Sequence, residues 1–274
     1  MVNKIVWYFI VGSLFLLIIF LLNFSHIRQT NEINYVGIPD GAAGLLARYV
    51  LDKKMEPHTI HSILFEPYTL YDCCASATQY AMGSGRLDIA IMCPEAAQEL
   101  VARDDRFEIA GPVMLNSDIL ITRQNADLHQ PSIGVSQKRE FQRQMVFRQF
   151  GTKSSAVPML HAAVPFAYAR GVIQGAVIDI TKAFNLKGEI TSASVHGQDI
   201  CTYVLVNKKS LLGSNQYHHF LEIYAEAVRE MDNPHNLLRL LQNYVSVNIT
   251  VGDVEKWKKM NVRFTYPFKY PRQE

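Results

Sequence analysis

Strand patterns alternate with helix patterns through the first third of the chain, and this alternation limits the possible folds more than any other feature. The strand patterns are the apolar runs Asn34–Pro39, Thr59–Phe65 and Leu87–Met92. Each run is followed by a segment with helical spacing of apolar residues, and the second run is expected to break at Pro67. Repeated strand–helix units are typical of a parallel sheet covered by helices. The sequence therefore predicts an α/β fold.

The same alternation continues in the middle of the chain. Val113–Thr122 is expected to form one strand that crosses to a second unit, in which a helix runs from Ser136 to Phe150. Cys201–Val206 is expected to return to the first unit, and the residues from Asn215 onward have helical spacing. We therefore predict two lobes joined by two crossings, near residues 115–125 and 190–205. The predicted limits are 33–120 plus 203–274 for the first lobe and 121–202 for the second.

The N-terminal residues 1–32 are expected to form an anchor and a linker. Ile5–Leu22 contains no charged residue, with Lys4 before it and Arg28 after it. Its length is close to the roughly 17–25 residues that span a bilayer, whereas the core of a cleaved signal is about 7–15 residues long. We expect an uncleaved signal anchor with the rest of the chain on the extracytoplasmic face of the cell membrane. A cleaved signal, which would release the chain, is the alternative.

Charge and motifs exclude several classes of function. The 27 basic and 25 acidic side chains give a net charge of +2, which offers no electrostatic basis for binding nucleic acid. The sequence has no G-x-S-x-G or H-E-x-x-H motif and no phosphate-binding loop. We therefore expect neither an enzyme nor a resident cofactor.

The cysteines are the most specific chemical signal. There are four of them: the adjacent Cys73 and Cys74, then Cys93, and finally Cys201. The first three fall where a predicted strand gives way to a helix, which is where α/β proteins bind ligands. Helix N-termini favour the thiolate, and thiolates prefer soft metals. This pattern predicts a thiol site, with Cys73, Cys74 and Cys93 as metal ligands and Cys201 entering from a crossing.

Two other interpretations of the cysteines stay open. Outside the cytoplasm, four cysteines most often form two disulfides, and here one of the adjacent pair would join Cys93 and the other Cys201. A reversible redox pair is the third interpretation. Met92 and Met114 could add thioether ligands, although both also fit an ordinary core.

Position at a strand end selects further candidate ligand-binding residues. They are Asp40 and Tyr71 from the first lobe, and Ser136, His161 and Asp179 from the second. A lone histidine such as His161 is more often an ordinary surface or core residue. Asp179 could instead cap the helix that follows its strand.

Three sequence pieces, in order, resemble a known family. They are Gly37-Ile38-Pro39-Asp40, then Gly83-Ser84-Gly85-Arg86-Leu87-Asp88-Ile89-Ala90, and then residues 171–180. Together they resemble the two-lobed periplasmic solute-binding proteins of ABC importers, in the branch of nitrate, sulfonate and thiamine-precursor binders. The resemblance implies hinged lobes that close on a small ligand, with permease and ATPase subunits as partners.

The cysteines are not part of the ordinary pattern of that family. They resemble the SaoB-type binding proteins of a selenocysteine-assisted organometal system, which implies an organometal cargo; this chain would be a sulfur-only member. We therefore predict an extracytoplasmic solute-binding subunit that captures a soft metal or organometal through thiolates. The alternative keeps the fold, pairs the cysteines as disulfides and binds a small organic solute such as a sulfonate or a thiamine precursor. A membrane-anchored thiol redox or metal-transfer enzyme is the third hypothesis.

Overall fold

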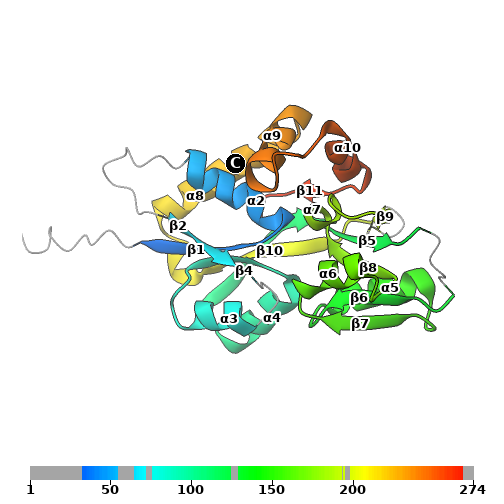
Figure 1. Ribbon diagram of the computed structural model, residues 1–274. Helices are drawn as coiled ribbons and strands as arrows, with labels where there is room; N and C mark the ends of the chain where they lie inside the picture. The colour runs from blue at the N-terminus through cyan, green and yellow to red at the C-terminus, as the bar shows by residue number, and fades with distance from the viewer. Residues whose placement is uncertain are drawn as a thin grey trace, which may run out of the picture.

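The computed structural model describes residues 33–54, 65–71, 76–124, 129–192, 194 and 198–267. These residues form two β-sheets covered by helices, which confirms the predicted α/β class (Figure 1). The expected anchor lies in residues 1–32, outside the described residues. None of the described helices is long and apolar enough to cross a bilayer.

The first sheet has six strands and contains both ends of the described chain. Its order is β11 (Arg263–Phe264), β4 (Phe107–Leu115), β10 (Cys201–Lys208), β3 (Ile89–Met92), β1 (Asn34–Pro39) and β2 (Phe65–Leu70). β1 is parallel to β2 and β3, whereas β10 lies antiparallel between β3 and β4. The prediction that the strand starting at Cys201 returns to the first unit is thus confirmed.

Helices cover both faces of this sheet. Figure 1 shows α2 (Ala42–Tyr49), α8 (Asn215–Glu230) and α9 (Pro234–Tyr244) on one face, and α3 (Ser76–Gly83) and α4 (Pro94–Arg103) on the other. A π-helical turn, Val50–Lys54, extends α2, and a 3₁₀ turn, Lys209–Leu211, follows β10. Met92 and Met114 are both fully buried in the larger of the two core clusters, in agreement with the interpretation that they are ordinary core residues.

The second sheet repeats the plan of the first. Its order is β7 (Ser155–Met159), β6 (Ser132–Ser136), β8 (Gly175–Asp179), β5 (Asp118–Thr122) and β9 (Glu189–Ser192). β6 is parallel to β7 and β8, and β5 lies antiparallel between β8 and β9. The helices of this unit are α5 (Glu140–Phe150), α6 (Ala163–Arg170) and the short α7 (Ile180–Ala183).

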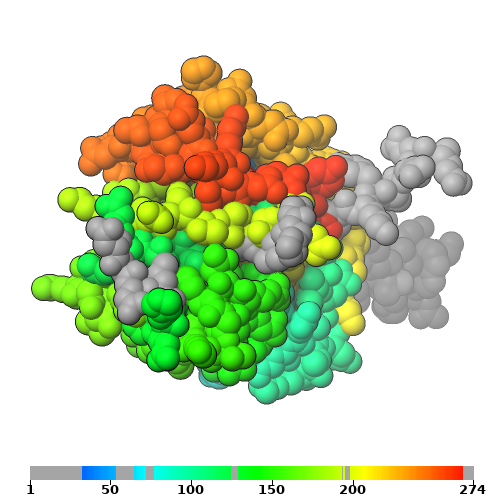
Figure 2. Space-filling model, turned by 90° about the vertical axis from the view of Figure 1, so that its right-hand side faces the viewer, coloured from blue at the N-terminus to red at the C-terminus, as the bar shows by residue number. Residues whose placement is uncertain are grey.

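The C-terminal residues bridge the two units. Figure 2 shows them, coloured orange to red, stacked above the green residues of the second sheet and its helices. α10 (Val251–Lys259) ends beside β9, where the Ser192 hydroxyl donates a hydrogen bond to the Met260 carbonyl at 3.0 Å. The tail therefore packs on both sheets.

The chain passes between the sheets at two adjacent places. Asn116 stands between β4 and β5, and its amide oxygen accepts a hydrogen bond from the Ile200 N–H at 2.8 Å, just before β10. The same side chain donates to Asp199 at 3.0 Å and to the Asn261 carbonyl at 2.9 Å. The chain thus leaves one sheet and enters the other at residues 116–117 and again at residues 193–200. The predicted lobe limits, 33–120 plus 203–274 and 121–202, stay a prediction.

Three expectations about local structure were wrong. Val113–Thr122 is not one strand, because Asn116 adopts a left-handed φ of 59° and separates β4 from β5. Pro67 does not break its strand but lies inside β2, which is an edge strand, where proline is tolerated. The helix expected from Ser136 starts later, at Glu140, because Lys138 also has a left-handed φ of 65°. The strand expected at residues 59–64 lies outside the described residues.

Candidate functional site

A cavity of about 440 Å³ lies between the two sheets, at the carboxyl ends of their strands. The end of β1 and helix α2 form one side, and the end of β8 with the starts of α6 and α7 forms the other. Its polar and aromatic lining residues are Asp40, Arg48, Tyr71, His161, Phe166, Asp179, Thr181, Lys182, Asn185 and Tyr244. The structure thus brings four residues selected from the sequence into one cavity, namely Asp40, Tyr71, His161 and Asp179.

Asp40 joins the two sides of the cavity by an ion pair. It follows β1, and its Oδ2 lies 2.6 Å from the Nζ of Lys182 on α7. Both side chains are partly exposed, and such pairs contribute about 0–1 kcal/mol. Lys182 therefore brings little uncompensated charge to the cavity.

Asp179 is held by backbone and hydroxyl donors from both sides. As the N-cap of α7 it accepts hydrogen bonds from the N–H of Thr181 at 3.0 Å and from its Oγ1 at 2.6 Å. Both carboxylate oxygens also lie 3.1 Å from the N–H of Ala42, at the start of α2. Gly41 makes this approach possible: its φ is 106°, and a Cβ there would stand 2.9 Å from Cγ of Asp179.

Burial is the main cause of the raised pKa of Asp179. The side chain is 1% exposed, and the negative charge of Asp118 adds to the increase, while the hydrogen bonds from Thr181 and Ala42 oppose it. Asp179 thus lines the cavity and caps α7 at the same time, so the two interpretations of its place in the sequence are compatible.

Ser136 does not line the cavity but contacts a residue that does. Its hydroxyl lies 2.9 Å from Nδ1 of His161, which lines the cavity. Ser136 itself is buried and lines a different hollow of about 370 Å³ at the start of α5, together with Lys138 and Arg143. The two predicted residues are in contact, but only the histidine reaches the cavity.

Sequence reasoning missed several lining residues. Arg48, in the last turn of α2, donates a hydrogen bond to the Thr69 hydroxyl at 3.2 Å and forms no ion pair with any carboxylate in the described ranges. Phe166 on α6 is 73% exposed, and Tyr244 ends α9. Burial, with the nearby Asp52, raises the pKa of Tyr244 to about 12. Of these three residues, only Arg48 could have been noticed in the sequence, because it is a charged residue within an apolar helix pattern.

Neither described cysteine lines the cavity. Cys93 is the N-cap of α4, as predicted, with Pro94 in the first turn, but it is only 1% exposed. Cys201 is a free thiol at the start of β10, and its Sγ donates to the Tyr203 carbonyl at 3.5 Å. Burial raises the pKa of Cys201 to about 11, which keeps it a neutral thiol at pH 7.

Of the three predicted metal ligands, Cys73, Cys74 and Cys93, only Cys93 is among the described residues. Within the described ranges, no cluster of three or more histidine, cysteine or acidic side chains is arranged to hold a metal. Thiolate capture of a metal therefore stays a prediction.

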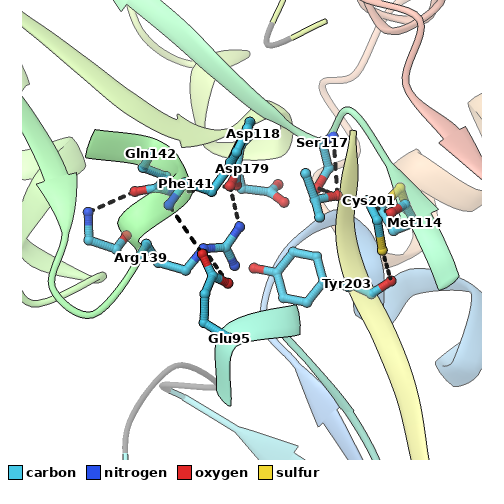
Figure 3. A network of polar contacts seen from close by, with 12 residues as sticks. Glu95, Met114, Ser117, Asp118, Arg139, Phe141, Gln142, Asp179, Cys201 and Tyr203 are labelled. Carbon is cyan, nitrogen blue, oxygen red and sulfur yellow. Dashed lines mark hydrogen bonds and ion pairs between the residues drawn. The ribbon is translucent and has the colours of Figure 1, made fainter. Parts of the chain in front are cut away.

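A second contact between the sheets is a buried polar network around Arg139 (Figure 3). The Arg139 guanidinium forms an ion pair with Asp118 and lies 3.9 Å from Glu95 of α4. It also stacks over the ring of Tyr203, 5.4 Å from the ring centre. Gln142 donates to Asp118 at 3.0 Å, and the Phe141 N–H donates to Glu95 at 3.3 Å. No sequence pattern predicts this network, because it depends on how the two sheets meet.

No protein-family model matches the sequence, and no curated protein matches it. Solved structures, however, share its fold. The ligand-binding component of an ABC-type import system from Staphylococcus aureus, with zinc bound, matches with a TM-score of 0.66 and 14% identity over 86% of this chain and 85% of that chain.

Two sulfonate-binding proteins give similar matches. The alkanesulfonate-binding protein SsuA from Xanthomonas axonopodis pv. citri, bound to MOPS, has a TM-score of 0.61 and 14% identity over 85% of this chain and 86% of that chain. The aliphatic sulphonate binding protein SsuA from Escherichia coli has a TM-score of 0.61 and 13% identity over 85% of both chains. This chain therefore has the mixed α/β fold of the periplasmic substrate-binding proteins of ABC importers.

Proposed function

We propose that this chain is the solute-binding subunit of an ABC importer, and that the cavity between its two sheets binds a small organic anion. Two observations support the receptor role: the fold, and the position of the cavity at strand ends contributed by both sheets. A volume of about 440 Å³ is within the range of roughly 300–1,000 Å³ that is usual for small-molecule sites.

The charge of the cavity wall favours an anion. The position of Arg48 carries the proposal, because Arg48 lines the cavity and its guanidinium forms no ion pair with a carboxylate within the described ranges. The other side-chain cation, Lys182, already faces Asp40. A guanidinium binds carboxylate and sulfonate groups through charge-assisted hydrogen bonds. An anionic group beside Arg48 would supply the missing counter-charge.

The aromatic lining favours an organic body on that anion. Tyr71 and Phe166 are 82% and 73% exposed, and both line the cavity together with Tyr244. Large exposed aromatic rings at a cavity are typical of ligand contacts. The Xanthomonas protein with this fold holds MOPS, an alkylsulfonate that carries a morpholine ring. Small organic sulfonates and carboxylates are therefore the first ligands to test.

Capture of a soft metal or organometal is the second candidate. It is favoured by one observation: Tyr71 lines the cavity, and Cys73 and Cys74 follow it closely in the chain. The Staphylococcus protein, which has the same fold, was solved with zinc bound, and this supports testing a metal ligand. We expect permease and ATPase subunits as partners for either ligand, and no enzymatic activity. A position on the extracytoplasmic face, with residues 1–32 as the anchor, remains part of the proposal.

Isothermal titration calorimetry of the reduced full-length protein in mild detergent tests the proposal. The probes are MOPS, taurine, butanesulfonate and benzoate, with inorganic sulfate as the control for charge alone, beside Hg(II) and methylmercury. We expect one organic anion to bind one-to-one, with unchanged affinity after the accessible thiols are alkylated. If only the mercurials bind, and alkylation of the thiols abolishes this binding, the organic-anion proposal is wrong and the thiolate metal site takes its place.

A further inference from the structure

Two buried aspartates face each other on neighbouring strands of the second sheet. Asp118 on β5 is the register partner of Asp179 on β8, and the side chains are 0% and 1% exposed. Directly opposed residues of an antiparallel pair have Cβ atoms about 4.5–5.5 Å apart. Figure 3 shows the two carboxylates next to each other. Two carboxylates this close in a dry interior strongly disfavour the doubly ionised state.

The two carboxylates differ in the groups that surround them. Asp118 is paired with Arg139 and accepts a hydrogen bond from Gln142. Asp179 has no cation among its described partners, which are the N–H of Ala42 and the N–H and hydroxyl of Thr181. Burial raises the pKa of Asp179, and the charge of Asp118 raises it further. The proton of the pair is therefore held mainly on Asp179.

The other charged groups near Asp179 do not alter this assignment. Lys182, on the same short helix, is neutralised by Asp40, and Glu95 lies beyond Arg139. Arg48 and His161 stand on the cavity wall, where solvent screens them. The Oδ1 atom of Asp118 is buried and has no hydrogen-bond partner among the described residues. It is the acceptor that a proton on Asp179 would satisfy.

We propose that Asp118 and Asp179 share one proton, and that this proton is taken up when the two sheets close on each other. Asp179 is buried because it reaches the start of α2 on the other sheet. Separation of the sheets would expose Asp179 to water, where it loses its proton to the solvent. Acid therefore favours the closed arrangement, and the pair acts as a proton-dependent latch.

The latch has a consequence that rests on the proposed function. A protonated Asp179 removes one negative charge from the wall of the cavity, so an organic anion near Arg48 should bind more tightly at lower pH. The latch itself is tested without any solute, so its failure and the failure of the anion site give different results.

Thermal melting of the full-length protein in mild detergent, from about pH 5 to about pH 9, tests the latch. A raised pKa in the folded state means that the stabilisation is present in acid and is lost as the pH rises through that pKa. Asp179→Asn keeps the position neutral, retains an oxygen acceptor and can donate to Asp118. We expect this variant to melt about 2–4 °C higher than the wild type at the alkaline end, with a difference that shrinks toward acid.

The matched variant Asp118→Asn should have the opposite effect. It leaves the buried Arg139 without its carboxylate and should lower the melting temperature across the whole pH range. Parallel melting profiles for the wild type and Asp179→Asn, or a lower melting temperature of Asp179→Asn at every pH, would overturn the latch.

Infrared spectroscopy of the wild type gives a second measurement that needs no stable variant. At neutral pH we expect the carbonyl stretch of a protonated, buried carboxylic acid, which is absent from a protein whose carboxyl groups are all ionised. The band should persist to a higher pH than that of an exposed aspartic acid. A spectrum without this band at neutral pH would contradict the shared proton.

Discussion

Cys93 and Asp179 occupy matching places in the two sheets but differ in their surroundings. Each stands at the end of the third strand of a parallel trio, β2-β1-β3 in the first sheet and β7-β6-β8 in the second, and each is the N-cap of the next helix. Both are 1% exposed. Asp179 lines the cavity and accepts a hydrogen bond from the start of α2, on the other sheet, whereas Cys93 does not line the cavity.

The difference shows what a strand end does and does not determine. The topology brings the helix starts of both sheets to the same seam, which is why Glu95, two residues after Cys93, meets Arg139 across it. Which side chain reaches the cavity depends on the partner presented by the other sheet. For Asp179 this partner is the start of α2, where Gly41 leaves room.

Asp179→Ala should lower the unfolding free energy most, and Cys93→Ala is the variant to compare it with. Asp179→Ala removes the acceptor of three donors, and buried donors without a partner cost about 1–3 kcal/mol. Cys93→Ala removes one buried sulfur, which should cost about 1 kcal/mol. Chemical denaturation of both variants measures the two costs. A larger loss for Cys93→Ala than for Asp179→Ala would reverse the comparison.

Arg48→Gln should weaken ligand binding in the cavity without lowering the stability of the fold. We expect affinity for an organic sulfonate or carboxylate to fall by about 10- to 100-fold, as for the loss of a charge-assisted hydrogen bond. The unfolding free energy should change little, because Arg48 is half-buried and its side chain makes one hydrogen bond within the described part of the chain, to Thr69. Arg103→Gln, in an exposed pair with Glu99, is the matched control. Equal loss of affinity in both variants would argue against a specific role for Arg48.

Phe166→Ala tests the aromatic wall next to His161. Loss of the ring should weaken binding of the same anion by about 2- to 10-fold, because an aromatic contact contributes about 0.5–1.5 kcal/mol. Phe147 on α5 is also partly exposed but does not line the cavity, so Phe147→Ala is the control. Calorimetry of the two variants decides the point. Unchanged affinity in Phe166→Ala would place the organic part of the ligand elsewhere.

The smallest effect should come from Lys182→Met. This change removes the ion pair with Asp40, which spans the cavity but is partly exposed, and it should cost about 0–1 kcal/mol of unfolding free energy. The cost should shrink further at high salt, since solvent screens exposed pairs. Denaturation at low and high salt checks both statements. A loss above that range would mean that this pair, rather than Asp179, holds the two sheets together.

Much of the fold could be predicted from apolar patterns and helix signals. β1 was predicted to the residue, and the sequence Cys93-Pro94-Glu95 identified the start of α4. The break between β4 and β5 was missed because it depends on one left-handed residue, Asn116, whose side chain is fixed by distant parts of the chain. Such a turn is determined by tertiary contacts rather than by local composition.

The sequence predicted only those residues of the candidate site that lie next to the ends of strands. That rule found Asp40, Tyr71, His161 and Asp179, which come from both sheets. Arg48 and Phe166 lie on helices, and no pattern indicates which turn of a helix will face a cavity. The rule also selected Cys93, which lies outside the cavity because strand ends fix position but not the direction of the side chain.

Parallel titration of two variants tests the central claim most directly. Arg48→Gln and the double variant Cys73→Ser/Cys74→Ser would each be titrated with the tightest organic anion and with methylmercury, in reduced full-length protein. The account predicts that the anion is lost in Arg48→Gln and bound with unchanged affinity in the cysteine variant. Tight methylmercury binding that survives in Arg48→Gln and disappears in the cysteine variant, with no organic anion bound by the wild type, would contradict it.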